Sequence, residues 1–525
     1  MGHTCPPGRS WAPGLTALLV ALLLSAGCVD QKREIARYRD ILDAQVPPPP
    51  AYEANAPLSF SRALAITSQN NEAISISGEN YLQALIQKNR VVAAFLPTVN
   101  FQPSYVIQQV ARPRLDETPT ASSSGTGTPT AQSIAAATAS RIAADRAANN
   151  AAHQAAVNSG FRTRGDIQYR TELPVVGEIN LFRGFGDVAS LRAADWTIEQ
   201  RRQLMLDAQV AVLLNAGQVF YQVLRAERQV EVLRNSLKVQ EARVADTEQS
   251  FRNGLSTKLA VAQTQAQAAG TRATLVQAEA DVANGRSTLA FVMGVSAVDG
   301  PLIDDAAVPA QMAAEEELER QAVENRQDLL AAAAAVKAAR NAVDVAVSEY
   351  YPSVTLNVNA FLYREYFLEA SKWNAVLSAN LPLFSAGIIE ANVRLAWSAL
   401  RQAALNESEL RRQVVTDVRT TYENLITSER RIRELEAEVA AADEALKQAQ
   451  AALANKLGIE LDVLTAQDQL LTAQLLLTGA RFDRTVFYLD LLRAAGQLGT
   501  AAAAATQPAG EAPASQPAVA SRSGG

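Results

Sequence analysis

Few side chains in this sequence are suited to nucleophilic or metal chemistry. The 525 residues contain two cysteines, Cys5 and Cys28, and two histidines, His3 and His153. A Cys–His catalytic pair or a zinc site needs several such side chains held close together. Carboxylates are numerous, but they lie mainly on the flanks of long helical patterns, where they are ordinarily solvated. We therefore expect no enzyme, no metal site and no bound cofactor.

The start of the chain has the pattern of an export signal. Arg9 is the only charged residue before an apolar run at 15–24. A run of about ten residues suits a signal peptide and is too short to cross a bilayer. It leads into Leu-Ser-Ala-Gly-Cys at 24–28, which resembles the bacterial lipoprotein signal. The resemblance implies that residues 1–27 are removed and that Cys28 is the lipidation site. An ordinary signal peptide followed by an unmodified cysteine is the alternative.

The overall composition favours long helices packed side by side. Aromatic residues make up 6% of the chain and charged residues 19%, while alanine is abundant throughout. Such a composition is typical of extended helical proteins. The formal net charge is −6, the sequence pI is about 5.4, and no basic run interleaved with aromatic residues occurs. We therefore expect no nucleic-acid partner.

The sequence contains an internal repeat. Residues 253–261 align with 455–463 at an offset of 202, and Leu181-Phe182 recurs as Leu383-Phe384 at the same offset. A fixed offset of this kind indicates that one architectural unit occurs twice. The chain is therefore predicted to be built from two similar halves.

The first half carries an insertion. Residues 97–99 align with 352–354 at an offset of 255, so about 53 additional residues lie between this point and Leu181. Residues 112–164 supply them, as a Thr/Ser/Gly-rich stretch followed by an alanine-rich one. Such a segment buries little apolar area. We predict a surface insertion that lies on the exterior side of the protein.

Two segments in each half alternate between apolar and polar residues, which predicts strands with one apolar and one polar face. These segments are about 96–110 and 166–183 in the first half, and about 352–363 and 373–384 in the second. The apolar face can cover the core of a soluble sheet, or it can face lipid on a membrane barrel. Four strands cannot close a barrel, because the smallest single-chain barrels have about eight. Three chains would supply twelve.

A long helix is predicted after each pair of strands. Segments 187–251 and 388–453 contain no proline, and each would extend about 100 Å at 1.5 Å per residue. Apolar residues recur at spacings of three and four, which is typical of a coiled-coil seam. A short break and a second helix follow each segment, so we predict helical hairpins at 187–293 and 388–496. An isolated structural coiled coil would explain the helices but not the strands.

The breaks form the tips of the two hairpins, and they are rich in leucine and glycine. Glycine can adopt the left-handed conformation at a helix end, and Ser256 could cap the returning helix. Apolar side chains that face water at a tip commonly meet a partner, although a purely structural turn is the alternative. The tip residues that we expect to contact a partner are Asn253, Gly254, Leu255, Ser256, Leu259, Lys456, Leu457, Gly458, Ile459 and Leu461.

Taken together, these features resemble the TolC family of outer-membrane efflux proteins over residues 58–497. The resemblance rests on Leu-Ser-Phe-Ser-Arg-Ala-Leu at 58–64, Leu-Phe-Arg-Gly-Phe-Gly at 181–186, Leu-Phe-Ser-Ala-Gly at 383–387 and both tips. It implies a fold that is mostly α with membrane β. In this fold, a trimeric 12-stranded β-barrel with four strands per chain continues into a long periplasmic α-helical barrel. The protein would be lipid-anchored in the cell outer membrane.

The resemblance also implies a division of the chain and a function. The expected parts are a signal peptide at 1–27, a lipidated linker at 28–57, repeats at 58–300 and 301–497, and a disordered tail at 498–525. The expected function is the outer-membrane channel of a tripartite efflux or type I secretion system. As a homotrimer, it would pass small molecules or secreted substrates to the exterior with a periplasmic adaptor protein and an inner-membrane transporter. A structural or adhesive lipoprotein without transport is the alternative.

Family members often narrow the periplasmic end of the bore with acidic residues after the second tip, in a pattern like Asp-Val-Leu-Asp-Ala. This chain has Asp-Val-Leu-Thr-Ala at 462–466. Asp462 fits the first acidic position, and Thr465 replaces the second. The resemblance implies a periplasmic constriction with a ring of three Asp462 carboxylates, which would attract cations. A solvated aspartate favoured by the helix dipole is the alternative.

Overall fold

The computed structural model describes residues 31–44, 46, 52–109, 162–164, 167–306, 308–309, 312–364, 371–455 and 457–499. Cys28, His153, Lys456, the predicted signal peptide, most of the predicted insertion and the predicted tail from residue 500 lie outside these residues. The chain divides into two compact units. The helical unit comprises the described residues of Met1–Gln87, Asp195–Ala338 and Leu400–Gly525. The sheet unit comprises those of Lys88–Ala194 and Ala339–Ala399.

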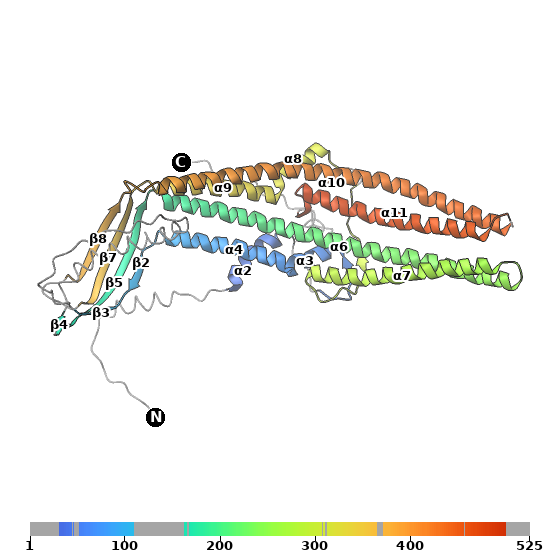
Figure 1. Cartoon of the computed structure of the whole chain (residues 1–525), viewed down its shortest axis with the longest axis horizontal. Coiled ribbons are helices and arrows are strands. Elements are labelled where there is room, and N and C mark those ends of the chain that lie inside the picture. Colours follow the sequence, from blue (N-terminus) through green and yellow to red (C-terminus); the bar gives the residue numbers. More distant parts are fainter. Residues whose placement is uncertain are drawn as a thin grey trace, which may run out of the picture. The chain divides into compact units, whose positions relative to one another are not determined.

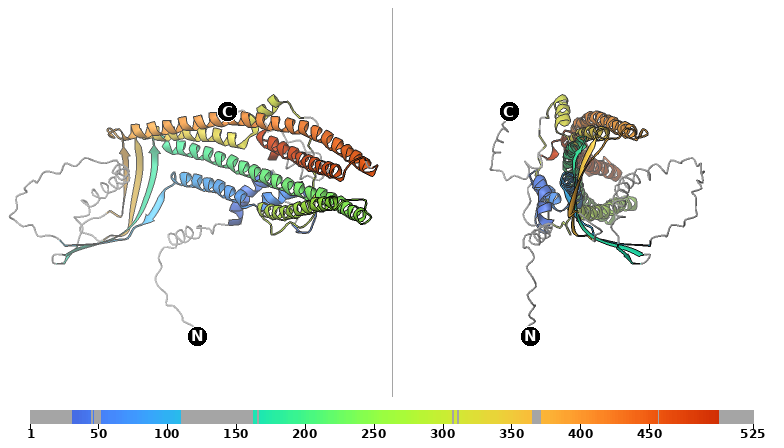
Figure 2. Two further views of the ribbon diagram at one scale, coloured as in Figure 1. Left: turned by 45° about the vertical axis from the view of Figure 1, so that its right-hand side comes forward. Right: turned by 90° about the vertical axis from the view of Figure 1, so that its left-hand side faces the viewer.

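Two antiparallel helical hairpins dominate the helical unit (Figures 1 and 2). Each begins with a helix of 67 residues, α6 (Gly186–Arg252) or α10 (Ile388–Ala454), whose first turns belong to the sheet unit. Each returns through a shorter helix, α7 (Lys258–Met293) or α11 (Glu460–Ala494). The other helices among the described residues are α2 (Gln31–Asp43), α3 (Phe60–Asn70), α4 (Glu72–Ala93), α8 (Glu315–Asn325) and α9 (Gln327–Ser348).

Of the helices in the described residues, one, α6, is long and apolar enough to cross a membrane, and 56% of its apolar 18-residue stretch is buried inside the chain, as in a core helix.

The main core of the helical unit is largely aliphatic, contains three packed aromatic rings, and joins the two repeats. Phe60 of α3 packs edge-on against Phe220 of α6, with ring centroids 5.6 Å apart, and Leu489 of α11 is buried in the same cluster. The hydroxyl of Tyr221 donates a hydrogen bond of 2.7 Å to Asp304. This bond satisfies the one polar group that burial of the tyrosine would otherwise leave unpaired. Beside the core, β1 (Leu58–Ser59) pairs in parallel with β6 (Leu302–Ile303).

Part of the segment predicted as a linker, 28–57, is instead a packed helix. Helix α2 buries Tyr38 and Leu42, and Gln209 of α6 donates a hydrogen bond to the Leu42 carbonyl. The Tyr38 ring lies so close to Gly78 of α4 that a Cβ there would be 2.4 Å from a ring carbon. The prediction was wrong over α2 because a helix of 13 residues gives only a short periodic signal.

The sheet unit contains an antiparallel sheet in the order β2-β5-β7-β8, and β3 and β4 also pair with β5 (Figure 1). Its strands are β2 (Thr98–Phe101), β3 (Ser104–Gln109), β4 (Arg162–Arg164), β5 (Ile167–Arg183), β7 (Ser353–Arg364) and β8 (Trp373–Asn380). Among the described strands, β8 pairs only with β7, and β2 and β3 pair only with β5. Within the described part of the chain, both edges of the sheet are therefore open.

Three strand boundaries differ from the prediction. The expected strand at 96–110 is divided into β2 and β3 around Pro103, which has no N–H to donate. The expected strand at 373–384 ends at Asn380, just before Pro382 interrupts the pattern. Residues 162–164, assigned to the insertion, form β4 and pair with β5. The three residues of β4 are all polar, so the alternation of apolar and polar residues that predicts strands did not distinguish β4 from the insertion.

The register confirms that the sheet has one apolar and one polar face. One face places these residues side by side across four strands: Val99, Gly177, Val358 and Ala375. The other face bears Asn180, Thr355 and Ser378. On the apolar face, Val99, Trp373 and Leu377 are 69%, 64% and 65% exposed. An apolar face left bare in this way indicates contact with lipid or with another chain.

The junctions between strand and long helix show the same backbone in both repeats. Gly184 and Phe185 have φ angles of +58° and +64°, and Ala386 and Gly387, at the offset of 202, have φ angles of +50° and +80°. The glycine is first in one pair and second in the other. A Cβ on Gly184 would lie 2.5 Å from the Ser348 carbonyl oxygen, which explains the order in the first repeat.

Replacing Gly184 by alanine should destabilise the protein by about 2–4 kcal/mol, because left-handed strain adds to a backbone clash. The matched control is Gly387→Ala, where a Cβ has no heavy atom within 4 Å. That change should cost about 1 kcal/mol from the left-handed backbone alone. Thermal unfolding of the purified protein in detergent measures both losses. Equal losses would contradict the steric explanation.

Candidate functional site: the two hairpin tips

The first tip is a tight turn made by glycine and closed by a threonine cap. Gly254 has a φ of +70°, and the Leu255 amide donates to the Ser250 carbonyl at 2.8 Å. Thr257, not Ser256, is the N-cap of α7, and its hydroxyl accepts a hydrogen bond of 3.1 Å from the Ala260 amide. The predicted cap was therefore wrong by one residue. The sequence offers two adjacent hydroxyl residues, and the second has the extended backbone of a cap.

The second tip closes differently. The amides of Leu457 and Gly458 both donate to the Ala452 carbonyl, at 2.8 and 3.2 Å. Gly458 is not among the glycines with positive φ, so left-handed glycine occurs only at the first tip. The N-cap of α11 is Ile459, whose side chain cannot accept a hydrogen bond. Asp462 compensates in part, because its Oδ2 accepts a hydrogen bond of 3.1 Å from the Ile459 amide.

Both tips expose their apolar side chains. Leu255 is 77% exposed and Leu457 is 85% exposed, and the two residues occupy equivalent positions in the repeat. The remaining apolar residues of the tips are exposed too: Leu259, Ile459 and Leu461. Large apolar side chains held out by defined turns are suited to contact a partner.

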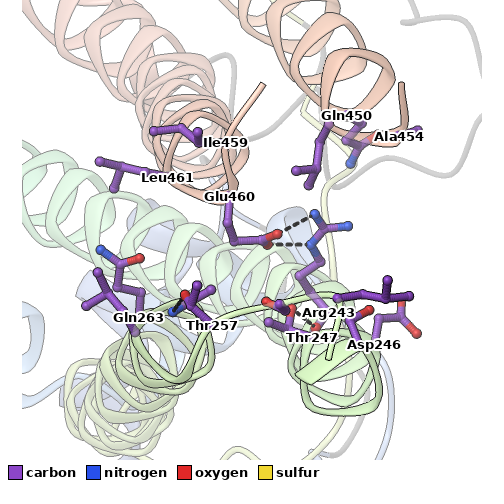
Figure 3. Close-up of a pocket in the computed structure, with 16 residues that line it drawn as sticks. Arg243, Asp246, Thr247, Thr257, Gln263, Gln450, Ala454, Ile459, Glu460 and Leu461 are labelled. Atoms are coloured by element: carbon purple, nitrogen blue, oxygen red, sulfur yellow. Dashed lines mark hydrogen bonds and ion pairs between the residues drawn. The ribbon is translucent and has the colours of Figure 1, made fainter. Parts of the chain in front are cut away.

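A cavity of ≈ 660 Å³ lies between the two tips (Figure 3). Arg243 of α6 and Glu460 at the start of α11 point toward one another in it. The guanidinium donates twice to the carboxylate, from Nε to Oε1 at 2.7 Å and from Nη2 to Oε2 at 2.9 Å. The two side chains are 24% and 15% exposed. This paired geometry makes a strong ionic link between the first and the second hairpin.

Further bonds join the same two helices away from the tips. Gln218 of α6 donates to Asp490 of α11 at 2.9 Å, and Arg225 pairs with Asp483 at 2.9 Å. Burial raises the pKa of the Asp490 carboxyl above its ordinary value, and the hydrogen bond from Gln218 opposes part of that shift. Helix α6 of the first repeat is thus tied to α11 of the second at several levels.

Asp462 and Thr465 are both exposed in the first two turns of α11. The Thr465 hydroxyl donates a hydrogen bond of 2.8 Å to the Leu461 carbonyl, and the Asp462 carboxylate accepts a hydrogen bond from the Ile459 amide. The local role of Asp462 is therefore that of a partial helix cap. Its place in a ring of three carboxylates stays a prediction.

Sequence reasoning missed Arg243 and Glu460. Their positions are 217 residues apart, and no periodic pattern connects them. The available signal was Glu460, an acidic residue in the first turn of a helix. Its partner across the cavity, Arg243, belongs to the other repeat.

Comparisons with known proteins place these features in context. Residues 177–295 and 318–497 match the family described as outer membrane efflux protein. The probable outer membrane lipoprotein SilC of Salmonella typhimurium is 24% identical over 328 residues, which are 59% of this chain and 69% of that protein. The outer membrane protein TolC of Vibrio cholerae serotype O1 is 27% identical over 319 residues, which are 59% of this chain and 73% of that protein.

Solved structures share the fold. The outer membrane protein VceC from Vibrio cholerae gives a TM-score of 0.65 at 19% identity, covering 83% of this chain and 96% of that one. A structure of CusC gives a TM-score of 0.67 at 15% identity, covering 86% of this chain and 97% of that one. At these identities the likeness concerns the fold alone.

Proposed function

Because the chain belongs to the outer membrane efflux protein family, it is an outer-membrane channel of an efflux or secretion system, and we propose that three copies assemble to form it. Each copy would contribute its antiparallel sheet to one closed barrel of twelve strands. The open edges at β8 and at β2 and β3 support this arrangement, because unpaired edges cannot be left in lipid. The helical hairpins of the three copies would continue the bore into the periplasm.

The bare apolar face of the sheet carries this proposal. Val99, Trp373 and Leu377 would face lipid, and the polar side chains of the opposite face would line the bore. A soluble adhesin or structural lipoprotein would need to cover that face with other elements. The family and fold are those of channels, so no catalytic role is assigned.

Planar bilayer recordings of the purified protein test the channel directly. A channel of this kind gives discrete open levels, and a structural or adhesive lipoprotein gives none. Crosslinking in detergent should give a trimer as the largest specific species. Absence of conductance from a correctly folded trimer would overturn the proposed function.

We further propose that both tips dock into a periplasmic adaptor protein, which connects the channel to an inner-membrane transporter. The exposed leucines at equivalent positions of the two repeats support this role. The ionic link between Arg243 and Glu460 would hold the hairpins together at the periplasmic entrance, where Asp462 would line the constriction. Relatives include a cation efflux system protein and a proteases secretion protein, so the family fold alone does not select the cargo.

The mature protein should carry lipid on Cys28, as in a lipoprotein. Small residues and an apolar run precede this cysteine, and the named relative SilC is a probable outer membrane lipoprotein. Mass spectrometry of the mature N-terminal peptide should find an acylated Cys28. A Cys28→Ser variant with a replacement signal peptide should still insert, because the barrel anchors the trimer. An unmodified N-terminus at another residue would refute the assignment.

A further inference from the structure

A smaller cavity lies between the two hairpins, and it shares no lining residue with the cavity at the tips. Its volume is ≈ 300 Å³, and side chains of α6, α10 and α11 line it. All the lining residues belong to the helical unit of a single chain. A ligand held in this cavity would therefore contact both hairpins of that chain.

The charged side chains that line the cavity are two arginines and one aspartate. Arg225 Nη1 of α6 donates to Asp483 Oδ1 of α11 at 2.9 Å. The guanidinium of Arg431 on α10 makes no hydrogen bond or ion pair with any residue that the structure describes. The residues on either side of Arg431 along α10 are all described. The cavity therefore offers one guanidinium that has no counter-ion in the described chain.

A glycine within α11 explains why Arg225 and not Arg431 pairs with Asp483. Gly479 is buried in the interior of this helix, where glycine costs about 1 kcal/mol relative to alanine. A Cβ at Gly479 would lie 2.9 Å from Nη2 and 3.2 Å from Cζ of Arg225. The guanidinium of Arg225 thus lies against the bare backbone of Gly479, one helical turn before Asp483. This close approach directs Arg225 to the carboxylate and leaves Arg431 unpaired.

The remaining walls of the cavity combine hydrogen-bond donors with apolar surface. The side chains of Gln229 and Thr472 can both donate, and within the described residues neither takes part in a hydrogen bond. Leu475 and Leu476 of α11 supply the apolar surface. A guanidinium with neighbouring donors suits a carboxylate, and an adjoining apolar wall suits the hydrocarbon part of the same molecule.

We propose that this cavity binds a small organic carboxylate, with the charged group on Arg431 and the apolar part against Leu475 and Leu476. A purely inorganic anion would use the guanidinium but would leave the leucines without a contact. An arginine that serves only to keep the surface solvated needs neither the two donors nor the apolar wall beside it. Because the site lies within one chain, the inference depends neither on the proposed trimer nor on transport.

Isothermal titration calorimetry with benzoate tests the site, using the full-length protein in detergent at pH 7 and detergent alone as the blank. Arg431→Gln should weaken benzoate binding by about tenfold, because it removes a charge-assisted hydrogen bond. The matched control is Arg433→Gln. Arg433 lies two residues further along α10, has no hydrogen bond or ion pair among the described residues, and lines a different cavity. This control should bind benzoate as the wild type does.

Two further measurements test the other walls. Leu476 is 41% exposed, so Leu476→Ala should fold normally; it should weaken benzoate binding by about threefold through lost apolar contact and leave acetate binding unchanged. Thr472→Val removes one donor and should weaken both ligands by a similar factor. Wild-type protein should bind benzoate about tenfold more tightly than acetate, because the ring of benzoate buries additional apolar surface.

Folded wild-type protein without saturable benzoate binding would overturn the inference, and so would equal affinities in wild type and Arg431→Gln. Equal weakening in Arg433→Gln would also overturn it, because net charge rather than the cavity would then be responsible. Acetate bound as tightly as benzoate would refute the role of the leucines and with it the organic carboxylate. Bilayer conductance is measured separately, so a protein that binds benzoate but does not conduct would count against the proposed function alone.

Discussion

Replacing Leu255 and Leu457 together by aspartate should abolish export while leaving assembled protein at normal abundance in the outer membrane. Both side chains are more than three-quarters exposed, so the folded chain loses little when they are changed. If they dock into an apolar adaptor surface, each substitution places a carboxylate there without a partner. A buried unpaired charge costs several kcal/mol, and three chains would present each tip three times.

Export of a known substrate and abundance in outer-membrane fractions should be measured on the same cells. Leu255→Met with Leu457→Met is the matched control, because it keeps the apolar contact and should export normally. Conductance of the isolated double aspartate variant should persist, since the sheet unit is unchanged. Normal export by that variant would mean that the tips are only turns. Failure to accumulate would mean that these leucines are needed for folding, and the docking proposal would lose its support.

Local chemistry made several features predictable from the sequence. Alternation with a period of two is enough to assign the two faces of the sheet, because side chains on a strand alternate. The repeat offset of 202 makes the two junctions between strand and long helix equivalent in the sequence. The residue pairs with left-handed backbone, Gly184-Phe185 and Ala386-Gly387, lie at that offset. Exposure of Leu255 and Leu457 could also be expected, because a turn between two long helices has no core to enter.

Features that depend on contacts between distant segments could not be predicted in this way. Helix α2 is stabilised by packing of Tyr38 and Leu42 on other helices rather than by a long pattern of its own. The N-cap of α7 is Thr257 rather than the adjacent Ser256, and the sequence offers a hydroxyl at both positions. The Arg243–Glu460 pair needs the second hairpin to lie beside the first, and sequence spacing carries no information about that distance.

The Arg243–Glu460 pair should act as a latch, and reversing one of its charges should raise the conductance of the isolated channel severalfold. Arg243→Glu would place two carboxylates together where a bidentate ion pair now joins α6 to α11. Because both side chains are less than one-quarter exposed, loss of the pair should weaken the link between the hairpins by about 2–3 kcal/mol per chain. Repulsion adds to that loss, so the hairpins should separate at the periplasmic entrance.

The double variant Arg243→Glu with Glu460→Arg should restore low conductance, because it remakes the pair with the charges exchanged. Arg225→Glu is the matched control on the same helices. The Arg225–Asp483 pair is 41% and 39% exposed, and surface pairs contribute only about 0–1 kcal/mol, so this variant should conduct almost as the wild type does. A rise in conductance that the double variant fails to reverse would indicate general loosening of the hairpins. Unchanged conductance in Arg243→Glu would show that the entrance is held by other contacts, such as the Asp490–Gln218 bond deeper along α6 and α11.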